Sequence, residues 1–287
     1  MARRDVRARL VASMLIVFAS SNLGAAAQTT QDSPGGPPPL VSTVEAPPGT
    51  DTLKVEWIKV AAPGSGAMLA AVARPSGNGQ FPTIILMHGT HGFAQEYVRL
   101  ARDLADGGVL AVAACWFRGS GGGGARFVTP IACTDAPPMP AGSSPEALQS
   151  LETLVRAART LPGARPDRLA LFGHSRGAAP VLNYILKNDT ARAVILNSSG
   201  YPSTLSTDVK APLLMLHGTA DSPDDGGVAV TQIDMARDFE KKLRAAGKPV
   251  EAVYYDGGRH NDIFGNPTQY RAEVQEMLKF LHRHFAN

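Results

Sequence analysis

Residues 172–177 read Phe172-Gly173-His174-Ser175-Arg176-Gly177, a Gly-x-Ser-x-Gly pattern. The apolar run before them predicts a buried strand, and the segment Ser175–Lys187 after them has a helical pattern. A serine on such a sharp turn projects its Oγ clear of the sheet, and the glycines avoid collisions across the turn. Ser175 is therefore a candidate nucleophile, and the Arg176 backbone N–H, at the positive end of a helix, is a candidate oxyanion donor. The alternative is a Gly/Ser loop that caps a helix.

Short apolar runs alternate with helical patterns from Leu53 onward, which is typical of an α/β fold with a mostly parallel sheet and helices on both faces. The runs Leu53–Val60 and Met68–Ala73 are separated by Pro63-Gly64-Ser65-Gly66 and predict an entry hairpin. Six further strands bring the expected number to eight: Thr83–Met87, Val109–Ala114, Arg168–Phe172, Ala193–Asn197, Pro212–Leu216 and Val250–Tyr255.

The clearest predicted helix begins after Ser144 and ends near Leu161. Ser144 suits the N-cap position because Pro145 follows at the first helical position. Apolar residues recur along one side of this segment: Leu148, Leu151, Leu154, Val155 and Ala158. The other expected helices are Tyr97–Ala105, Ser175–Lys187, Thr231–Ala246 and Pro267–Phe285.

The composition excludes several classes of protein. The 287 residues are 44% hydrophobic and 18% charged, too apolar for a disordered chain, and the 29 Gly and 22 Pro exclude a coiled coil. A net charge of +3 is far below the basic excess of a nucleic-acid binder, and basic residues form no block after the first ten positions. We therefore expect no nucleic-acid partner.

The first 27 residues have the pattern of a secretory signal peptide. A basic start, a short apolar run and a small-residue cleavage site follow one another as Arg3, Arg4, Arg7 and Arg9, then Leu10–Phe18, then Ala25-Ala26-Ala27 before Gln28. The apolar run falls well short of the ~20 residues of a spanning helix, which disfavours an uncleaved anchor. Cleavage would remove four Arg and one Asp and leave no formal net charge. We expect a secreted or periplasmic protein with no stable membrane insertion after cleavage.

Residues 28–50 are rich in proline and contain little to bury. Their prolines are Pro34, Pro37, Pro38, Pro39, Pro47 and Pro48. Such a composition predicts an extended tether without structure of its own. The expected organisation is a signal peptide at 1–27, a tether at 28–50 and one catalytic domain at 51–287.

A serine nucleophile needs a base, and seven histidines compete for that role. His260 is the best candidate because it lies in a glycine-flanked loop between the last expected strand and the final helix. His91 is the remaining alternative. The others have different expected roles: His282 and His284 solvated on the last helix, His174 inside the turn, His217 at a strand end, and His88 bracing an oxyanion loop.

The carboxylate that orients the base is expected after the strand that ends at Leu216. Asp221 is the nearest acid to that strand end, where ligand sites open in parallel sheets. Asp224 and Asp225 are the competing candidates, in which case Asp221 would cap a turn.

The order Ser175, Asp221, His260 on this strand pattern resembles the α/β-hydrolase superfamily. Within it, the compact dienelactone hydrolase-like and cutinase-like serine hydrolases are similar over Leu53–Phe285. The resemblance implies an α/β-hydrolase fold without a large lid, and an ester hydrolase that uses a Ser-His-Asp triad, an acyl-enzyme, and neither metal nor organic cofactor.

The same resemblance implies a second oxyanion donor just after the turn His88-Gly89. That donor maps onto the backbone N–H of Thr90, with His91 as the alternative. The sequence departs from two relatives, because dienelactone hydrolase itself carries a cysteine nucleophile and because the triple-glycine turn of lipases is absent here.

Cys115 and Cys133 are the two cysteines of the chain. In an exported protein this pair predicts a disulfide, which stabilises a loop of this size by ~3 kcal/mol in the chain-entropy model. The alternative is two unrelated buried thiols. We expect the bridge to hold the segment Cys115–Ala141 over the mouth of the site.

The substrate side of the site is expected to be open. Asn197–Pro212 is too short for a helical lid, so the outer wall would come from the loop that follows Cys115. Arg118 and Arg126 on that loop, together with His91, are candidate substrate-binding residues. The expected protein is a monomer that acts on small-molecule or polymeric esters. A peptidase or amidase on the same scaffold and a non-catalytic binding protein are the alternatives.

Overall fold

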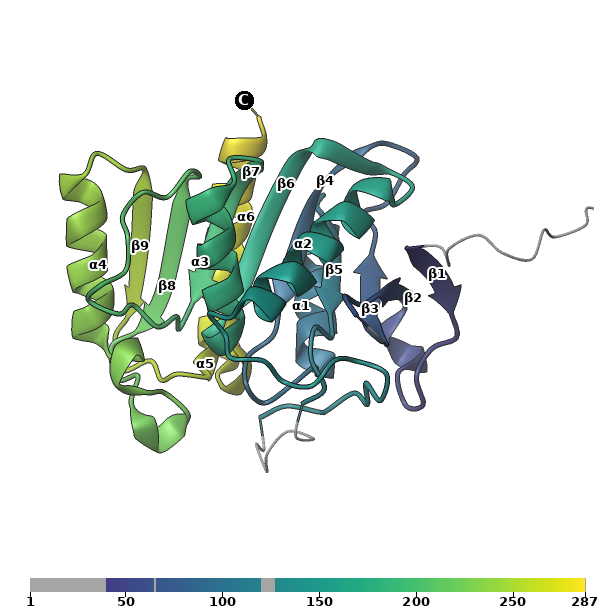
Figure 1. Cartoon of the computed structure of the whole chain (residues 1–287), viewed down its shortest axis with the longest axis horizontal. Helices are drawn as coiled ribbons and strands as arrows, with labels where there is room; N and C mark the ends of the chain where they lie inside the picture. Colours follow the sequence, from purple (N-terminus) through teal and green to yellow (C-terminus); the bar gives the residue numbers. More distant parts are fainter. Residues whose placement is uncertain (1–39, 65, 120–126, 287) are drawn as a thin grey trace, which may run out of the picture. The chain divides into compact units, whose positions relative to one another are not determined.

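A nine-stranded sheet runs through the described part of the chain (Figure 1). The computed structural model describes residues 40–64, 66–119 and 127–286, which belong to one structural unit, Pro38–Asn287. The predicted signal peptide, residues 28–39 of the predicted tether, and Arg126 lie outside the described residues.

The strands follow the order β1-β2-β3-β5-β4-β6-β7-β8-β9 across the sheet. They are β1 (Val41–Val44), β2 (Glu56–Ala61), β3 (Ala67–Ala73), β4 (Phe81–Met87), β5 (Leu110–Ala114), β6 (Ala164–His174), β7 (Ala191–Asn197), β8 (Leu213–Gly218) and β9 (Val250–Tyr255). The strands β1, β2, β3 and β5 pair antiparallel with one another. From β5 onward, the strands β5, β4, β6, β7, β8 and β9 pair parallel. The carboxyl ends of the parallel strands therefore meet at one edge of the sheet.

The edge strand β1 is the one that the sequence does not predict, and it corrects both the expected number of eight strands and the expected start of the domain at residue 51. β1 lies inside the predicted tether and pairs with β2, with Val41 opposite Val60 and Val44 opposite Trp57. None of its four residues is fully buried, because it is an edge strand. So short and exposed a strand lacks the apolar run by which a buried strand is predicted from sequence. The folded domain therefore begins before residue 51.

Helices cover both faces of the sheet, as the alternating pattern predicts. Their bounds are α1 (Gln95–Asp106), α2 (Pro145–Thr160), α3 (Ala178–Lys187), α4 (Ile233–Ala245), α5 (Asp262–Gly265) and α6 (Pro267–Phe285). The apolar sides of α2, α3 and α4 pack on one face, and those of α1 and α6 pack on the other. Figure 1 shows α2 and α3 in front of the sheet and α1 and α6 behind it.

Two helix starts follow from local capping chemistry. The Ser144 Oγ accepts a hydrogen bond from the Ala147 amide at 3.3 Å, which confirms the predicted N-cap. At α6, the side chain of Asn266 accepts from the amides of Thr268 and Gln269 at 3.0 and 3.2 Å. A proline occupies the first turn in both cases, where its missing N–H breaks no helical bond.

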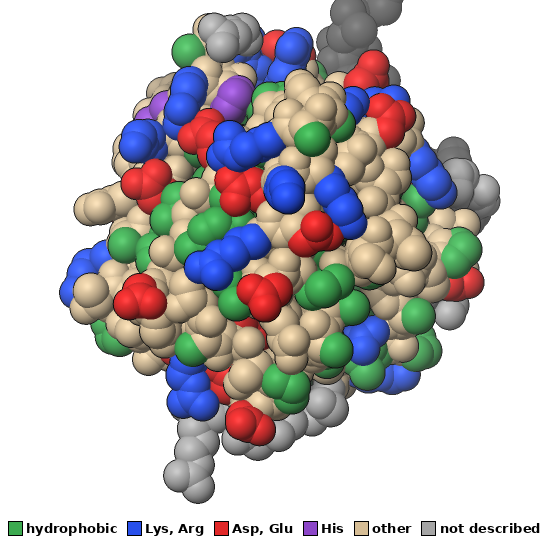
Figure 2. Space-filling model, turned by 90° about the vertical axis from the view of Figure 1, so that its left-hand side faces the viewer, with side chains coloured by type: hydrophobic (Ala, Val, Ile, Leu, Met, Phe, Trp, Pro, Cys, Tyr) green, Lys and Arg blue, Asp and Glu red, His purple; other side chains and the backbone are tan. Residues whose placement is uncertain are grey.

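The solvent side of α4 carries charges of both signs. Lys242 pairs with Asp238 and Arg244 with Glu240, each four residues apart. Figure 2 shows the end of the molecule that carries α4, with basic and acidic side chains interspersed. None of the helices within the described ranges is long and apolar enough to cross a membrane.

Candidate active site

Ser175 lies on a strained turn between β6 and α3. Its φ of +51° is in the left-handed region, which non-glycine residues adopt rarely. A Cβ on Gly173 would lie 2.5 Å from the Ala178 Cα, and one on Gly177 would lie 2.3 Å from the Met87 oxygen. Both glycines are therefore sterically required, as the sequence pattern predicts. The residues Ser175–Gly177 form a 3-10 turn, so α3 begins at Ala178 and not at Ser175.

Three side chains from three strand ends form a continuous hydrogen-bonded chain. The His260 Nε2 lies 2.9 Å from the Ser175 Oγ, and the His260 Nδ1 lies 2.7 Å from the Asp221 Oδ2. Ser175 follows β6, Asp221 follows β8 and His260 follows β9. Asp221 and His260 are 5% and 2% exposed, so their hydrogen bond is shielded from water, while Ser175 is partly exposed. The structure thus brings together the three residues that the sequence singled out.

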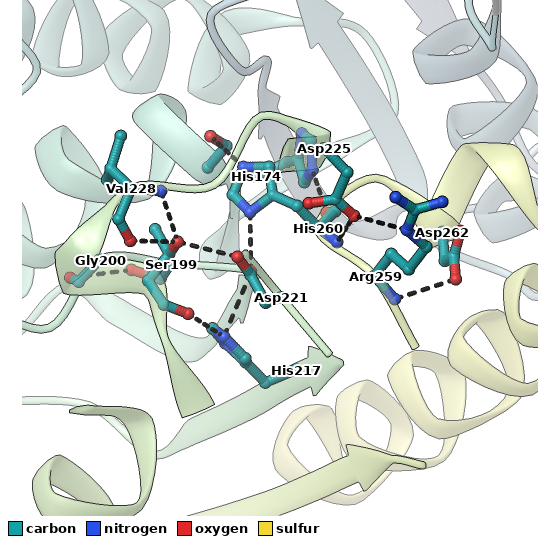
Figure 3. Close-up of polar contacts among 12 residues, drawn as sticks. His174, Ser199, Gly200, His217, Asp221, Asp225, Val228, Arg259, His260 and Asp262 are labelled. Atoms are coloured by element: carbon teal, nitrogen blue, oxygen red, sulfur yellow. Dashed lines mark hydrogen bonds and ion pairs between the residues drawn. The ribbon is translucent and has the colours of Figure 1, made fainter. Parts of the chain in front are cut away.

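Asp221 has two further partners that the sequence reasoning missed. Its Oδ1 accepts from the Thr231 hydroxyl at 2.9 Å. Its Oδ2 lies 3.3 Å from the His217 Nε2 (Figure 3). The same His217 nitrogen lies 2.6 Å from the Thr231 backbone oxygen. Burial opposes ionisation, but the bonds from His217 and His260 hold the pKa of Asp221 below its ordinary value. The carboxylate is therefore fixed and charged.

A glycine makes room for that carboxylate. A Cβ on Gly227 would lie 2.2 Å from the Asp221 Oδ1 and 2.9 Å from the Thr231 Oγ1. The loop after β8 therefore folds back so that the backbone of Gly227 packs against the carboxylate of Asp221. No local pattern in the sequence marks this close approach.

Asp225, the competing candidate acid, holds the backbone of the base. Its Oδ2 accepts from the His260 amide at 2.8 Å and pairs with the Arg259 Nε at 3.3 Å (Figure 3). The Asn261 side-chain amide donates to the Asp225 backbone oxygen at 2.6 Å. The loop after β8 thus fixes the loop after β9, while Asp224 is exposed.

The turn after β4 lies beside Ser175. A Cβ on Gly89 would lie 3.2 Å from the Ser175 Cβ. The Thr90 amide has no hydrogen-bond acceptor among the residues that the structure describes. A backbone N–H that is free at this position suits an oxyanion donor.

His88 braces this turn, as expected. Its ring is fully buried, its Nδ1 lies 2.9 Å from the Gly89 oxygen, and its backbone oxygen accepts from the Trp116 Nε1 at 3.0 Å. Burial lowers the pKa of His88 to about 3. The ring is therefore neutral.

Arg176 ties the turn after β4 to a more distant segment. Its Nε donates to the Thr90 Oγ1 at 3.2 Å, and its Nη1 donates to the Pro140 oxygen at 2.9 Å. Its side chain thus secures the residue that carries the proposed oxyanion amide. The Gly-x-Ser-x-Gly pattern predicts a role only for the backbone of Arg176.

A cavity of about 330 Å³ opens beside Ser175. Its apolar lining comes from α3 and from the segments after β7 and β8: Ala179, Leu182, Pro202, Leu205, Val228 and Val230. Gly142 and Ser143 line it as well. Among the described residues of the Cys115–Ala141 segment, none lines this cavity, and residues 200–205 and 226–231 form most of its wall. Residues 120–126 of that segment lie outside the described residues.

The two candidate substrate-binding residues, His91 and Arg118, lie elsewhere. Both line a separate cavity of about 330 Å³ that shares no lining residue with the one beside Ser175. The Arg118 Nη1 donates to the Thr134 oxygen at 3.3 Å. Burial lowers the pKa of His91 to about 4, and its ring stacks on Tyr97 with centroids 5.6 Å apart. Neither residue faces the cavity beside Ser175.

The predicted disulfide between Cys115 and Cys133 is present, with the two Cα atoms 6.5 Å apart. It joins the end of β5 to the segment that leads to Pro140 and so to Arg176. Neither cysteine lines the cavity beside Ser175, and Cys133 lines the separate cavity that holds His91 and Arg118. Within the described ranges, no group of three or more His, Cys, Asp or Glu side chains is arranged to hold a metal ion.

Comparisons with known proteins agree with this architecture. The model of the dienelactone hydrolase family matches residues 68–281. A Methylorubrum extorquens protein named for carboxymethylenebutenolidase is 26% identical over 219 residues, which cover 72% of this chain and 72% of that protein.

Solved structures establish the α/β-hydrolase fold. A Klebsiella pneumoniae protein named for dienelactone hydrolase superposes with a TM-score of 0.58 at 22% identity, covering 78% of this chain and 97% of its own. The acylaminoacyl peptidase of Pyrococcus horikoshii gives 0.62 at 17% identity, over 81% of this chain but 42% of its own. Esterases share the fold as well.

Proposed function

The chain belongs to the dienelactone hydrolase family and is a hydrolase, and on this premise we propose that it cleaves carboxylic esters with Ser175 as nucleophile. The observation that supports this most is the unbroken chain of short hydrogen bonds from Ser175 through His260 to Asp221 on a strained elbow. A serine hydroxyl is a weak nucleophile without an adjacent base, and this arrangement supplies one.

The proposed reaction has two half-reactions. The Ser175 Oγ attacks the ester carbonyl carbon while the His260 Nε2 takes the hydroxyl proton, and the amides of Thr90 and Arg176 stabilise the oxyanion. The His260 imidazolium then protonates the leaving alcohol, and an acyl-enzyme remains. Water attacks the acyl-enzyme in the second half-reaction, His260 again acts as base, and the carboxylic acid leaves.

Asp221 holds the base in the productive tautomer. Its carboxylate accepts the Nδ1–H of His260, which leaves the Nε2 lone pair directed at Ser175. Thr231 and His217 anchor the other directions of that carboxylate. Because Asp221 stays ionised, it also stabilises the imidazolium that forms in each half-reaction.

The cavity beside Ser175 favours an ester with an uncharged, apolar group. Leu182, Leu205 and Val230 are among its apolar lining residues, and the cavity volume of about 330 Å³ holds a group of several carbons. Val228 also lines the cavity and is 54% exposed, so this part of the lining lies at the protein surface. We expect a p-nitrophenyl hexanoate to be a better substrate than the acetate, and Leu205→Asp to abolish that preference.

The decisive experiment compares Ser175→Ala with Ser150→Ala. Ser150 is 4% exposed on α2 and bonds to a backbone oxygen, so its variant controls for loss of a buried hydroxyl. We expect Ser175→Ala to lose at least ~10³-fold in kcat toward p-nitrophenyl esters, while Ser150→Ala stays active. Full activity of Ser175→Ala would refute the proposal. A parallel panel of amide and peptide substrates tests the peptidase alternative.

Export is part of the proposal. Its support is the basic and apolar pattern of residues 1–27 together with a disulfide, which persists in oxidising compartments. Mass spectrometry of the protein from the periplasm or medium should find Gln28 as the first residue. A cytosolic protein with its first 27 residues intact would contradict export without affecting the catalytic proposal.

A further inference from the structure

The hydroxyl of Tyr97 makes three polar contacts inside the protein. Tyr97 lies on α1 and is 0% exposed. Its Oη lies 2.9 Å from the Gly89 amide nitrogen, 2.8 Å from the His174 Nδ1 and 3.1 Å from the His91 Nε2. One buried oxygen therefore joins α1 to the turn after β4 and to the end of β6.

Each contact is one residue away from a group of the proposed active site. Gly89 precedes Thr90, whose amide is a proposed oxyanion donor, and His174 precedes the nucleophile Ser175. The His174 Nε2 lies 3.4 Å from the backbone oxygen of His260. The Tyr97 hydroxyl thus sits between the backbone of the oxyanion turn and that of the nucleophile elbow.

Donors and acceptors fit this cluster in one consistent way. A tyrosine hydroxyl has one proton and two lone pairs. If it donates to the His174 Nδ1, the other ring nitrogen of His174 carries a proton and donates to the His260 oxygen. The two lone pairs then accept from the Gly89 amide and from the His91 Nε2–H, so the Tyr97 hydroxyl and both ring nitrogens of His174 have partners. In the opposite assignment, His174 Nδ1–H donates to the Tyr97 hydroxyl, and the unprotonated Nε2 faces the His260 carbonyl oxygen, so two acceptors oppose each other.

The surroundings leave this hydroxyl little freedom. Phe264 meets the Tyr97 ring edge-on with centroids 4.7 Å apart, and His91 stacks on it. A Cβ on Gly89 would lie 2.9 Å from the His174 Nδ1, so the turn and the elbow are already in contact. Burial lowers the pKa of His174 well below its ordinary value, which keeps this acceptor neutral.

We propose that Tyr97 is a positioning residue for the oxyanion hole, which its hydroxyl sets by fixing the Gly89–Thr90 turn against the His174–Ser175 elbow. The proposal rests on the proposed function, because it assigns Thr90 and Ser175 their roles in ester cleavage. The bond that Gly89 donates aims the next amide, that of Thr90, at the place where negative charge develops. A displaced amide weakens the transition state more than the bound substrate.

The test is Tyr97→Phe in the full mature protein, which keeps the ring and removes the hydroxyl. The matched control is Tyr184→Phe, because Tyr184 is 4% exposed and its hydroxyl bonds to the Thr190 Oγ1 at 2.7 Å, outside the site. Each rate is divided by the concentration of active sites, which is titrated with a p-nitrophenyl phosphonate. A loss of folded protein is then not mistaken for a loss of catalysis.

The readout is the ratio of kcat/KM for an ester to that for its thionoester, in which sulfur replaces the carbonyl oxygen. An oxyanion hole favours oxygen, so a merely structural defect lowers both rates and leaves the ratio unchanged. We expect Tyr97→Phe to lower kcat about 10- to 100-fold with KM little changed, and to lower the ratio. Tyr184→Phe should leave kcat and the ratio unchanged.

A second variant keeps the proposal testable if Tyr97→Phe does not fold. His174→Leu removes the acceptor of the Tyr97 proton and should lower the same ratio. Unchanged ratios in both variants, or in whichever one folds, would overturn the role of Tyr97. The proposed function fails differently, through a wild-type protein without esterase activity or an active Ser175→Ala variant.

Discussion

Gly227→Ala should disable the proposed active site through a single added methyl group. The φ of Gly227 lies outside the left-handed region, so alanine fits the backbone and only the space around its Cβ matters. That Cβ would lie 2.2 Å from the Asp221 Oδ1, 2.7 Å from the Ser222 oxygen and 2.9 Å from the Thr231 Oγ1. The new carbon is thus surrounded by oxygens and cannot turn away.

The size of the effect follows from these distances. The Asp221 carboxylate must retreat by about 1 Å to reach even a tight contact, which breaks its 2.7 Å bond to the His260 Nδ1. A 1 Å displacement of a catalytic group costs about 10²-fold in rate, and overpacking costs about 1–3 kcal/mol in stability. We therefore expect kcat for a p-nitrophenyl ester to fall about 100-fold, with a modest drop in the urea midpoint.

The matched control is Gly79→Ala. Gly79 lies on the surface, and the nearest atom to its added Cβ would be the Phe81 Cζ at an ordinary 3.5 Å. This variant should keep full activity and stability. A folded Gly227→Ala protein with a kcat within about threefold of wild type would refute the reasoning, because the base would then not depend on the position of Asp221.

Three further predictions concern other parts of the molecule. Burial raises the pKa of Glu273 from 4.5 to about 8, so the stability this group contributes is complete below pH 4.5 and is lost as the pH rises toward 8. Urea titrations across that range should show unfolding free energy falling by up to about 1.4 kcal/mol per pH unit, and Glu273→Gln should flatten the slope. Cys133→Ser, which removes the bridge to Cys115, should lower the unfolding free energy by about 3 kcal/mol with little change in KM; unaltered stability would contradict a constraining bridge. Asp225→Ala deprives the His260 amide of its acceptor and should lower kcat about tenfold and the melting temperature by a few degrees; a wild-type kcat would contradict the role of Asp225 in holding the base.

Much of the candidate site is readable from sequence because its chemistry lies at strand ends. The elbow is defined by two glycines within five residues, and the geometry explains both of them. Asp221 and His260 follow apolar runs whose carboxyl ends meet at one sheet edge, so their distance along the chain does not matter. Ser144 caps α2 through its own side chain, which is likewise a local property.

The remaining features depend on contacts between loops that no local pattern records. Thr231 reaches Asp221 because the loop after β8 folds back on itself, and His217 contacts Asp221 from the end of β8. The cavity walls at residues 200–205 and 226–231 come from segments that are short and irregular, and a search for a long lid passes over them. The charge of Arg118 and its position after β5 predict a substrate contact, but Arg118 lines a different cavity.

The edge strand β1 has a practical consequence for attaching this protein to anything else. Five strand spacings separate β1 from β6, the strand that ends at the nucleophile elbow, which amounts to about 24 Å. A resin, a cell-surface anchor or a fusion partner joined ahead of Val41 would thus be held at the antiparallel margin of the sheet. Attachment at that margin would keep the ends of β6, β8 and β9, which carry the proposed active site, at least five strand spacings from the attachment point.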